Sequence, residues 1–251
     1  QSLYDPLVKK GAVFFSTNRR GAELIKYASN AFLATKITYI NEIANMCEKL
    51  NVNVEDVSIG MGLDNRIGGR FLRAGPAYGG SCFPKDTKAI LDTAHKFKTN
   101  LPLIKSVIKS NENRSKLLTN RIFKLLNNNL KNKKICFLGV TFKANTDDMR
   151  DSSCIKMIPV LSKKGALIDY YDPTGEKKEF KNIKNVKFKN SIKSACVNSD
   201  LIIIHTEWND FKSINFKKIM KKNNFKLFDM RNIYSLEKMK RDKVNYFSIG
   251  R

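Results

Sequence analysis

The segment around one cysteine carries the clearest chemical signal in the sequence. Residues 79–86 read GGSCFPKD, and Pro84 suits the first turn of a helix, which places Cys82 at a helix N-terminus. The positive end of the helix dipole and the charge of Lys85 would stabilise a thiolate there. Asp86 follows one helical turn later, on about the same face. This pattern predicts a nucleophilic cysteine with an assisting carboxylate, and the alternative is a small buried cysteine beside an ordinary helix start.

A second pair of polar residues is spaced for joint action. Lys26 and Asn30 are four residues apart in a segment with helical periodicity, so an ammonium group and an amide would share one helix face. Such donors can stabilise an alkoxide or an oxyanion. On spacing alone, a solvated helix face is the stronger interpretation of this pair.

A third candidate site follows an apolar strand at residues 135–139. The next residues, 140–153, contain Lys143 and Arg150 and lead into a predicted helix. Loops at the carboxyl ends of parallel strands bind ligands, and a helix N-terminus favours phosphate. No GxGxxG follows this strand, and the glycine pair in residues 60–62 lacks the third glycine of that fingerprint. The loop therefore predicts a phosphate site without a dinucleotide-binding fingerprint.

Apolar residues at three- and four-residue steps indicate that the first half of the chain is helical. Helices are predicted at residues 21–50, 54–59, 84–97 and 103–126. The first would be about 45 Å long, long enough to scaffold other helices or a partner subunit. Before it, a short strand is predicted at Val13–Phe15.

The second half alternates strands with helices. Strands are predicted at residues 135–139, 166–170, 201–204, 226–229 and 245–248, and helices at 153–164, 192–198, 216–222 and 236–241. This alternation predicts a doubly wound α/β domain. The predicted organisation is a remnant of a preceding domain or linker at 1–18, a central all-α domain at 19–118 and a Rossmann-like α/β domain at 119–251.

Composition excludes several classes of protein. Hydrophobic residues make up 42% of the 251 residues, so the chain is not disordered, and no apolar run approaches the roughly 20 residues of a membrane span. Five widely spaced cysteines fit neither a disulfide framework nor a metal site, and two histidines leave a zinc site short of ligands. This cysteine usage predicts a reducing, cytoplasmic compartment, and the shortage of ligands predicts that no metal is bound. No secretory signal is visible in residues 1–10.

The net charge of +24 is concentrated in residues 101–251, which hold 33 Lys and Arg against 14 Asp and Glu. The excess is mostly lysine scattered among asparagine, with few of the arginines and interleaved aromatics typical of nucleic-acid surfaces. We therefore expect no nucleic-acid partner. The same field would favour a phosphate-bearing small ligand.

Together, these residues resemble the UDP-glucose 6-dehydrogenase family of nucleotide-sugar dehydrogenases. The segments that carry the resemblance keep their order and spacing over nearly the whole chain, at residues 23–34, 41–44, 79–86, 139–153, 206–208 and 228–232. The GGSCFPKD motif favours the UDP-glucose branch over the branches for GDP-mannose and UDP-N-acetylmannosamine. Tyr78 and Met230 depart from the pattern, because they stand where phenylalanine and glycine are common.

The resemblance implies a four-electron oxidation at C6 of UDP-glucose to UDP-glucuronate, with two NAD+ and one water. Cys82 would hold C6 as a thiohemiacetal and then a thioester, and Asp86 would assist the hydrolytic water. Lys26 and Asn30 would hold the C6 oxygen, and Arg150 would meet the cofactor. The UDP-sugar would be bound by Phe71, Arg73, Tyr78, Gly79, Phe83, Phe142, Lys143 and Arg231, while Arg66 would reach the substrate of a neighbouring subunit in a homodimer built on helix 21–50.

One departure decides what activity we expect. Members of the family begin with a Rossmann domain that carries the NAD+ fingerprint, and that domain, with an early threonine and a glutamate that assist catalysis, is absent from the 251 residues. We therefore expect that this polypeptide alone does not oxidise UDP-glucose. Two alternatives stay open: a catalytically silent dimerisation or regulatory module that retains the UDP-sugar pocket, and a dehydrogenase for a related nucleotide sugar.

Overall fold

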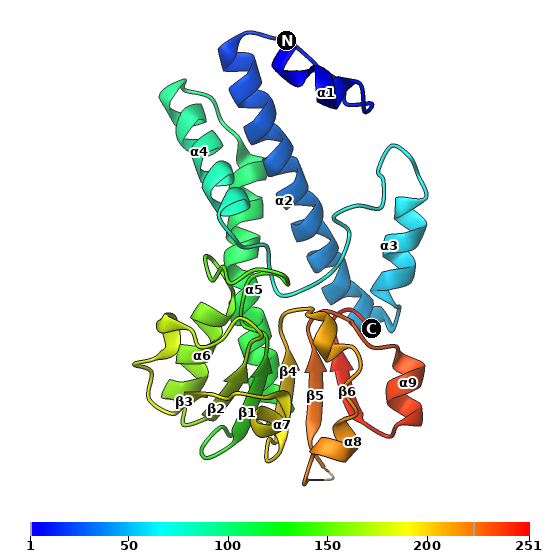
Figure 1. Cartoon of the computed structure of the whole chain (residues 1–251), viewed down its shortest axis with the longest axis vertical. Helices are drawn as coiled ribbons and strands as arrows, with labels where there is room; N and C mark the ends of the chain where they lie inside the picture. Colours follow the sequence, from blue (N-terminus) through cyan, green and yellow to red (C-terminus); the bar gives the residue numbers. More distant parts are fainter. Residues whose placement is uncertain (1, 223) are drawn as a thin grey trace.

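A computed structural model describes residues 2–222 and 224–251. Its helical half contains α2 (Arg19–Leu50), α3 (Val54–Gly62), α4 (Cys82–Lys96) and α5 (Pro102–Leu125). The helices α2, α4 and α5 pack against one another above the sheet, and α3 stands beside the C-terminal end of α2 (Figure 1). All four helices were predicted, with bounds that differ by three residues or fewer.

The longest element, α2, has 32 residues and rises about 48 Å along its axis. Its start is set by Asn18, whose side chain accepts a hydrogen bond from the Gly21 N–H, and its end by Asn51 in the left-handed region. One side of α2 is buried against the other helices. The opposite side exposes large apolar side chains at seven-residue steps, namely Ile25, Phe32, Tyr39 and Met46.

The helix α5 connects the two halves without a break. It runs through the division predicted between residues 118 and 119. Leu118 and Ile122 are fully buried and belong to the same apolar core as Phe137 and Ile203 of the sheet. Because the helix is shared, the two halves meet along a continuous core rather than across a linker.

The sheet has six parallel strands in the order β3-β2-β1-β4-β5-β6. This is the doubly wound order, in which the chain reverses direction across the sheet between β1 and β4. The strands are β1 (Lys134–Leu138), β2 (Leu167–Tyr171), β3 (Val186–Phe188), β4 (Leu201–Ile204), β5 (Lys226–Asp229) and β6 (Asn245–Ser248), and the connecting helices are α6 (Cys154–Lys163), α7 (Ile192–Cys196), α8 (Phe216–Ile219) and α9 (Leu236–Arg241).

Both faces of the sheet are covered, as the fully apolar strand β4 at its centre requires. One face packs on α5, α6 and the C-terminal part of α2. The other face packs on α7, α8 and α9. None of the described helices combines enough length with enough apolar character to cross a membrane.

The segment after β6 ties the sheet to the end of α2. The Glu48 carboxylate accepts hydrogen bonds from Arg121 and from the Gly250 N–H. The Val54 N–H donates to the Gly250 carbonyl, and Gly250 lies so close to α2 and α3 that a Cβ there would stand 2.8 Å from the Ala44 side chain. Residues 248–251 therefore close the joint between the halves.

Some sequence-based expectations were wrong. The strand predicted at Val13–Phe15 is an irregular, exposed segment that pairs with no described strand, and it follows short helices at Ser2–Tyr4 and α1 (Asp5–Val8) that were not predicted. The strand β3 and the 3-10 turns at Lys178–Phe180 and Asn209–Phe211 were also missed. The helices predicted to reach residues 198 and 222 end earlier, at Cys196 and Ile219.

Candidate active site

The cysteine of the GGSCFPKD motif occupies a distinct position among the five. Cys82 is the first residue of α4 and is exposed, whereas the other four cysteines are buried. No disulfide joins any of them within the described residues, although the sulfurs of Cys136 and Cys196 are 3.7 Å apart. The prediction that Cys82 begins a helix is confirmed, and its thiol lies at the end of α4 where the backbone N–H groups lack intrahelical acceptors.

Two glycines let the cysteine loop lie directly on the loop after β1. A Cβ at Gly79 would stand 2.6 Å from the Asp151 carbonyl oxygen, and a Cβ at Gly80 would stand 2.6 Å from the Phe142 ring. Gly80 also has a φ of +77° and donates its N–H to the Arg150 carbonyl at 2.8 Å. Side chains at these positions would separate the two loops. The glycine pair thus brings Cys82 of the helical half against the α/β half.

The polar residues predicted to assist Cys82 surround one buried carboxylate. Asp86 accepts a hydrogen bond from Asn30 Nδ2 at 2.5 Å and forms an ion pair with Lys85. Burial favours the neutral acid, but the bonds from Lys85 and Asn30 and the charge of Lys26 outweigh it and hold the pKa of Asp86 below its usual value. The groups of α2 and α4 are therefore brought together, and Asp86 is a carboxylate at neutral pH.

A cavity of about 450 Å³ lies at the carboxyl ends of the strands and is lined by Gly79 and Phe83 of the cysteine motif. The loop after β1 contributes Phe142 and Lys143, and the segments after β4 and β5 contribute Glu207 and Arg231. This is the edge at which β1 and β4 form the switch point of the sheet, where doubly wound folds bind ligands. All eight residues predicted to bind the substrate within one subunit line it, namely Phe71, Arg73, Tyr78, Gly79, Phe83, Phe142, Lys143 and Arg231.

The Arg231 guanidinium is fixed in the cavity wall by three oxygens. Its Nε donates to the His205 carbonyl at 2.8 Å, its Nη2 donates to the Phe142 carbonyl at 2.9 Å, and Glu207 pairs with it at 2.8 Å. Burial lowers the pKa of Arg231, and it also keeps the His205 ring neutral by lowering its pKa. A cation held this rigidly is suited to bind an anionic ligand.

Aromatic rings form another wall of the cavity. The Phe83 ring meets Phe71 and Tyr78 edge-on, with centroids 6.0 Å and 6.1 Å apart. Asn111 of α5 holds the Tyr78 backbone by two hydrogen bonds of 3.0 Å, one to its N–H and one to its carbonyl. Burial raises the pKa of the Tyr78 hydroxyl to about 12, so it stays protonated. Phe71 has a φ of +66°, a region that bulky residues rarely adopt.

The residues predicted to reach a neighbouring subunit's substrate and to meet the cofactor also lie outside this cavity. Arg66 is exposed in the loop after α3 and pairs with Asp64. Arg150 pairs with Asp148 at 2.8 Å and lines a shallow pocket with Lys85 and Lys88, next to Cys82. No group of three or more metal-binding side chains occurs among the described residues.

Sequence reasoning missed part of the cavity lining. Ile37, Asn41, Gly69, Arg70 and Glu207 line it without having been assigned to the site. Asn41 lies three helical turns after Asn30 on the same face of α2, and that spacing was available in the sequence. Gly69 and Arg70 belong to an irregular loop, where spacing carries no directional information.

Comparisons with known proteins extend along the whole chain. A UDP-glucose 6-dehydrogenase of Rickettsia felis is 44% identical over 253 residues, covering 100% of this chain and 56% of that protein. One of Rhizobium meliloti is 43% identical over 252 residues, covering 99% of this chain and 57% of that protein. The structure of a UDP-glucose dehydrogenase from Pyrobaculum islandicum is 30% identical with a TM-score of 0.80, covering 92% of this chain and 51% of that one. The chain spans little more than half the length of these proteins.

Two family profiles match separate parts of the chain. The central domain of the UDP-glucose/GDP-mannose dehydrogenase family matches residues 20–113, which include the cysteine motif and the groups around Asp86. The UDP-binding domain of the same family matches residues 136–236, which include the loops that contribute Phe142, Lys143 and Arg231. Sequence, fold and site geometry agree, and the chain belongs to the UDP-glucose/GDP-mannose dehydrogenase family.

Proposed function

We propose that the chain supplies the substrate site and the nucleophile for the NAD-dependent oxidation of UDP-glucose to UDP-glucuronate. One observation carries the proposal: α4 begins with an exposed cysteine, its next residue, Phe83, lines a cavity with aromatic and basic residues, and its Asp86 is a buried carboxylate with its own donors. The similarity to UDP-glucose 6-dehydrogenases supports the choice of sugar nucleotide.

In this proposal the cavity binds the UDP-sugar in two parts. The aromatic rings of Phe71, Phe83 and Tyr78 pack on the flat faces of the ligand. On the opposite side, Lys143 and Arg231 neutralise the diphosphate. This arrangement directs the sugar toward Cys82, because Gly79 and Phe83 line the cavity on either side of that residue in the chain.

The groups around Cys82 then act on C6 of the sugar. The thiolate adds to the C6 aldehyde as a thiohemiacetal, and the later thioester keeps C6 bound to the enzyme until water cleaves it. Asp86, ionised at neutral pH, accepts a proton from that water. Lys26 and Asn30 hold the C6 oxygen while it carries negative charge, since both lie on the face of α2 toward Asp86.

The oxidation needs a hydride acceptor, and NAD+ supplies that chemistry when it is bound. The donor set next to Cys82 fits a phosphate-bearing cofactor, because Lys85, Lys88 and Arg150 surround one shallow pocket there. In our proposal Arg150 contacts the cofactor from this side. Residues 1–251 by themselves are expected to produce no NADH.

We further propose a homodimer that buries the exposed side of α2. Ile25, Phe32, Tyr39 and Met46 recur at seven-residue steps, the spacing that places side chains along one seam between paired helices. Arg66 would then reach the substrate of the other subunit. All cysteines are free, which fits the reducing conditions of the cytoplasm, our proposed location.

Calorimetric titration tests the substrate proposal directly. UDP-glucose should bind residues 1–251, and UDP-N-acetylmannosamine and GDP-mannose should bind at least about tenfold more weakly. Binding of a control sugar with equal affinity would assign the site to a different nucleotide sugar. Binding of none of the three would contradict a substrate site in this chain.

Alkylation tests the nucleophile separately. Iodoacetamide should label Cys82 faster than the four buried cysteines, and UDP-glucose should slow that labelling. Exposure alone could give the first result, so Lys85→Met, which keeps the cysteine exposed and removes the neighbouring positive charge, tests the electrostatic contribution and should slow the labelling. Labelling that is unaffected by UDP-glucose would separate Cys82 from the cavity.

A further inference from the structure

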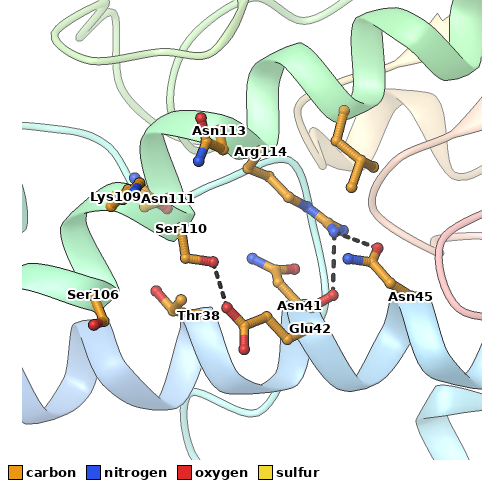
Figure 2. A pocket seen from close by; sticks show the side chains of 11 residues that line it. Thr38, Asn41, Glu42, Asn45, Ser106, Lys109, Ser110, Asn111, Asn113 and Arg114 are labelled. Atoms are coloured by element: carbon orange, nitrogen blue, oxygen red, sulfur yellow. Dashed lines mark hydrogen bonds between the residues drawn. The ribbon is translucent and has the colours of Figure 1, made fainter. Parts of the chain in front are cut away.

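A second cavity lies between α2 and α5, away from Cys82 (Figure 2). Its volume is about 410 Å³, close to that of the proposed substrate cavity. Its lining is almost entirely polar and consists of Thr38, Asn41, Glu42, Asn45, Ser106, Lys109, Ser110, Asn111, Asn113, Arg114 and Leu117. Only Asn41 lines both cavities, so the two are separate spaces with one shared wall.

One wall of this cavity is a buried guanidinium without a counter-ion. Arg114 is only 4% exposed and donates to three neutral oxygens: Gly75 O at 3.1 Å, Asn41 O at 3.1 Å and Asn45 Oδ1 at 2.8 Å. No carboxylate among the described residues forms an ion pair with it. Buried charges are normally paired, whereas the charge of Glu48 acts on Arg114 only from beyond ion-pair distance, so the guanidinium has capacity for an anionic partner.

Two polar atoms of the lining, one from α5 and one from α2, also lack partners. Arg114 Nη2 and Thr38 Oγ1 are buried and make no hydrogen bond to any described residue. Burial lowers the pKa of Arg114 to about 10, which still leaves the group cationic at neutral pH. A buried donor left without an acceptor costs stability. Neighbouring atoms cover both of these atoms, so a ligand oxygen would remove that cost once the side chains of the lining shift to admit it.

The other side of the cavity suits hydroxyl groups. The Glu42 carboxylate accepts a hydrogen bond from Ser110 at 2.5 Å and has acceptor capacity left (Figure 2). The Asn113 amide and the Lys109 ammonium, both from α5, also line the cavity. A fully anionic ligand would be repelled by Glu42, whereas a ligand with one anionic end and several hydroxyls matches both sides.

We propose that the cavity between α2 and α5 is a second ligand site, which binds a small hydroxylated anion of the sugar-acid or sugar-phosphate class with its charged group at Arg114. The charged groups of this site, and all of its lining residues except Asn41, are different from those of the substrate cavity. Hydrogen bonds connect it with that cavity at two points of the substrate loop. Arg114 and Asn41 bond the Gly75 backbone, and Asn111 bonds the Tyr78 backbone.

The test uses three probes that share a sugar ring. D-glucuronate, glucose 6-phosphate and uncharged glucose are titrated by calorimetry into residues 1–251 in the presence of saturating UDP. Binding of UDP is recorded first, in a separate titration, so failure of the substrate site is seen on its own. At least one anion should bind about tenfold or more tighter than glucose, and the comparison of the two anions identifies the class.

Variants of the lining residues, with one matched control variant, test whether the anion binds in this cavity. Thr38→Val removes the unpartnered hydroxyl at nearly constant volume and should weaken anion binding about threefold or more. Thr35→Val is the control, because the Thr35 hydroxyl already bonds the Ala31 carbonyl on the same helix and does not line the cavity. Arg114→Gln should weaken binding about tenfold or more. If Arg114→Gln fails to fold, Thr38→Val and Lys109→Ala still decide the question.

Two results would overturn the proposal. The first is that neither anion binds more tightly than glucose. The second is that anion binding is as strong in Thr38→Val and Lys109→Ala as in the parent chain, which would place the bound anion elsewhere.

Discussion

The two halves of the molecule treat their apolar surface differently. In the α/β half both faces of the sheet are covered by helices, and the side chains of β4 are fully buried. In the helical half one side of α2 is packed, while Phe32 on the opposite side is 65% exposed. The difference indicates that the sheet completes its own core, whereas α2 offers an apolar surface of the kind that self-association covers.

The reactive groups and the ligand-binding cation also come from different halves of the molecule. The groups that could react, Cys82 and Asp86 with their donors, come from the helical half. The rigid cation Arg231 comes from the α/β half, where backbone carbonyls fix it. A well-covered sheet holds the ligand-binding groups, and the less covered helices carry the reactive ones.

The largest expected effect comes from removing a ring from the covered core. Phe228→Ala should lower the free energy of unfolding by about 3–5 kcal/mol, because Phe228 is fully buried in β5 and packs under the Arg121 guanidinium. Phe32→Ala, on the bare side of α2, should change it by less than about 0.5 kcal/mol in the monomer. Urea denaturation at low protein concentration measures both. Equal losses would mean that the two apolar surfaces do not differ as described.

The second largest loss in the free energy of unfolding is expected at the joint between the halves. Gly250→Ala should cost about 2–4 kcal/mol, because φ is +71° and the new Cβ would lie 2.7 Å from Val54 Cγ1. Gly175→Ala is the matched control, with a φ of +87° but open space around the position, and should cost about 1 kcal/mol. Thermal and urea unfolding of the two variants give the comparison. Similar costs would show that the contact with α2 and α3 adds nothing.

Lowering the pH should reduce the stability of the helical half, because Asp86 becomes protonated. Its pKa is lowered in the folded chain, so the ionised form contributes stability that is complete above the unfolded-state value of about 4 and is lost as the pH falls through the folded value. Asp86→Asn should therefore lose less stability than the parent between about pH 5 and pH 3. The effect is smaller than the packing effects, because burial offsets part of the gain. Urea midpoints across this range measure it, and Asp92→Asn, an exposed carboxylate of the same helix, should follow the parent.

The smallest effect is expected for the loop that carries Arg66. Lys36 of α2 donates to the carbonyls of Ile67 and Gly68 at 2.9 Å and 2.8 Å. Lys36→Met should cost about 1 kcal/mol and speed proteolysis within residues 64–70. Lys49→Met, an exposed lysine of the same helix, should do neither. Unchanged proteolysis in Lys36→Met would show that the loop is held by other contacts.

The elements with strong periodicity were predictable from sequence, and those that depend on tertiary partners were not. The strands at residues 201–204, 226–229 and 245–248 have the predicted bounds because they are apolar or follow clear helix ends. The strand β3 was missed because its three residues include Lys187 and only β2 defines it. Val13–Phe15 looks like a strand by composition, yet no described neighbour supplies the hydrogen bonds that would make it one.

The site was predictable where spacing along one helix sets direction. Cys82 with Asp86, and Lys26 with Asn30, follow from steps of four residues. That the two pairs meet at one carboxylate depends on how α2 packs on α4, which spacing does not contain. The cavity between α2 and α5 gave no sequence signal, because Arg114 looks like any helix-surface arginine until its burial is known.

The backbone of Phe71 has a consequence for how this chain could be engineered. A φ of +66° suits glycine better than phenylalanine, so Phe71→Gly would relieve strain in the substrate loop. It would also delete the ring that meets Phe83 at the cavity wall. A screen that rewards melting temperature alone would therefore select against the aromatic wall, and libraries at this position need a ligand-binding criterion from the first round.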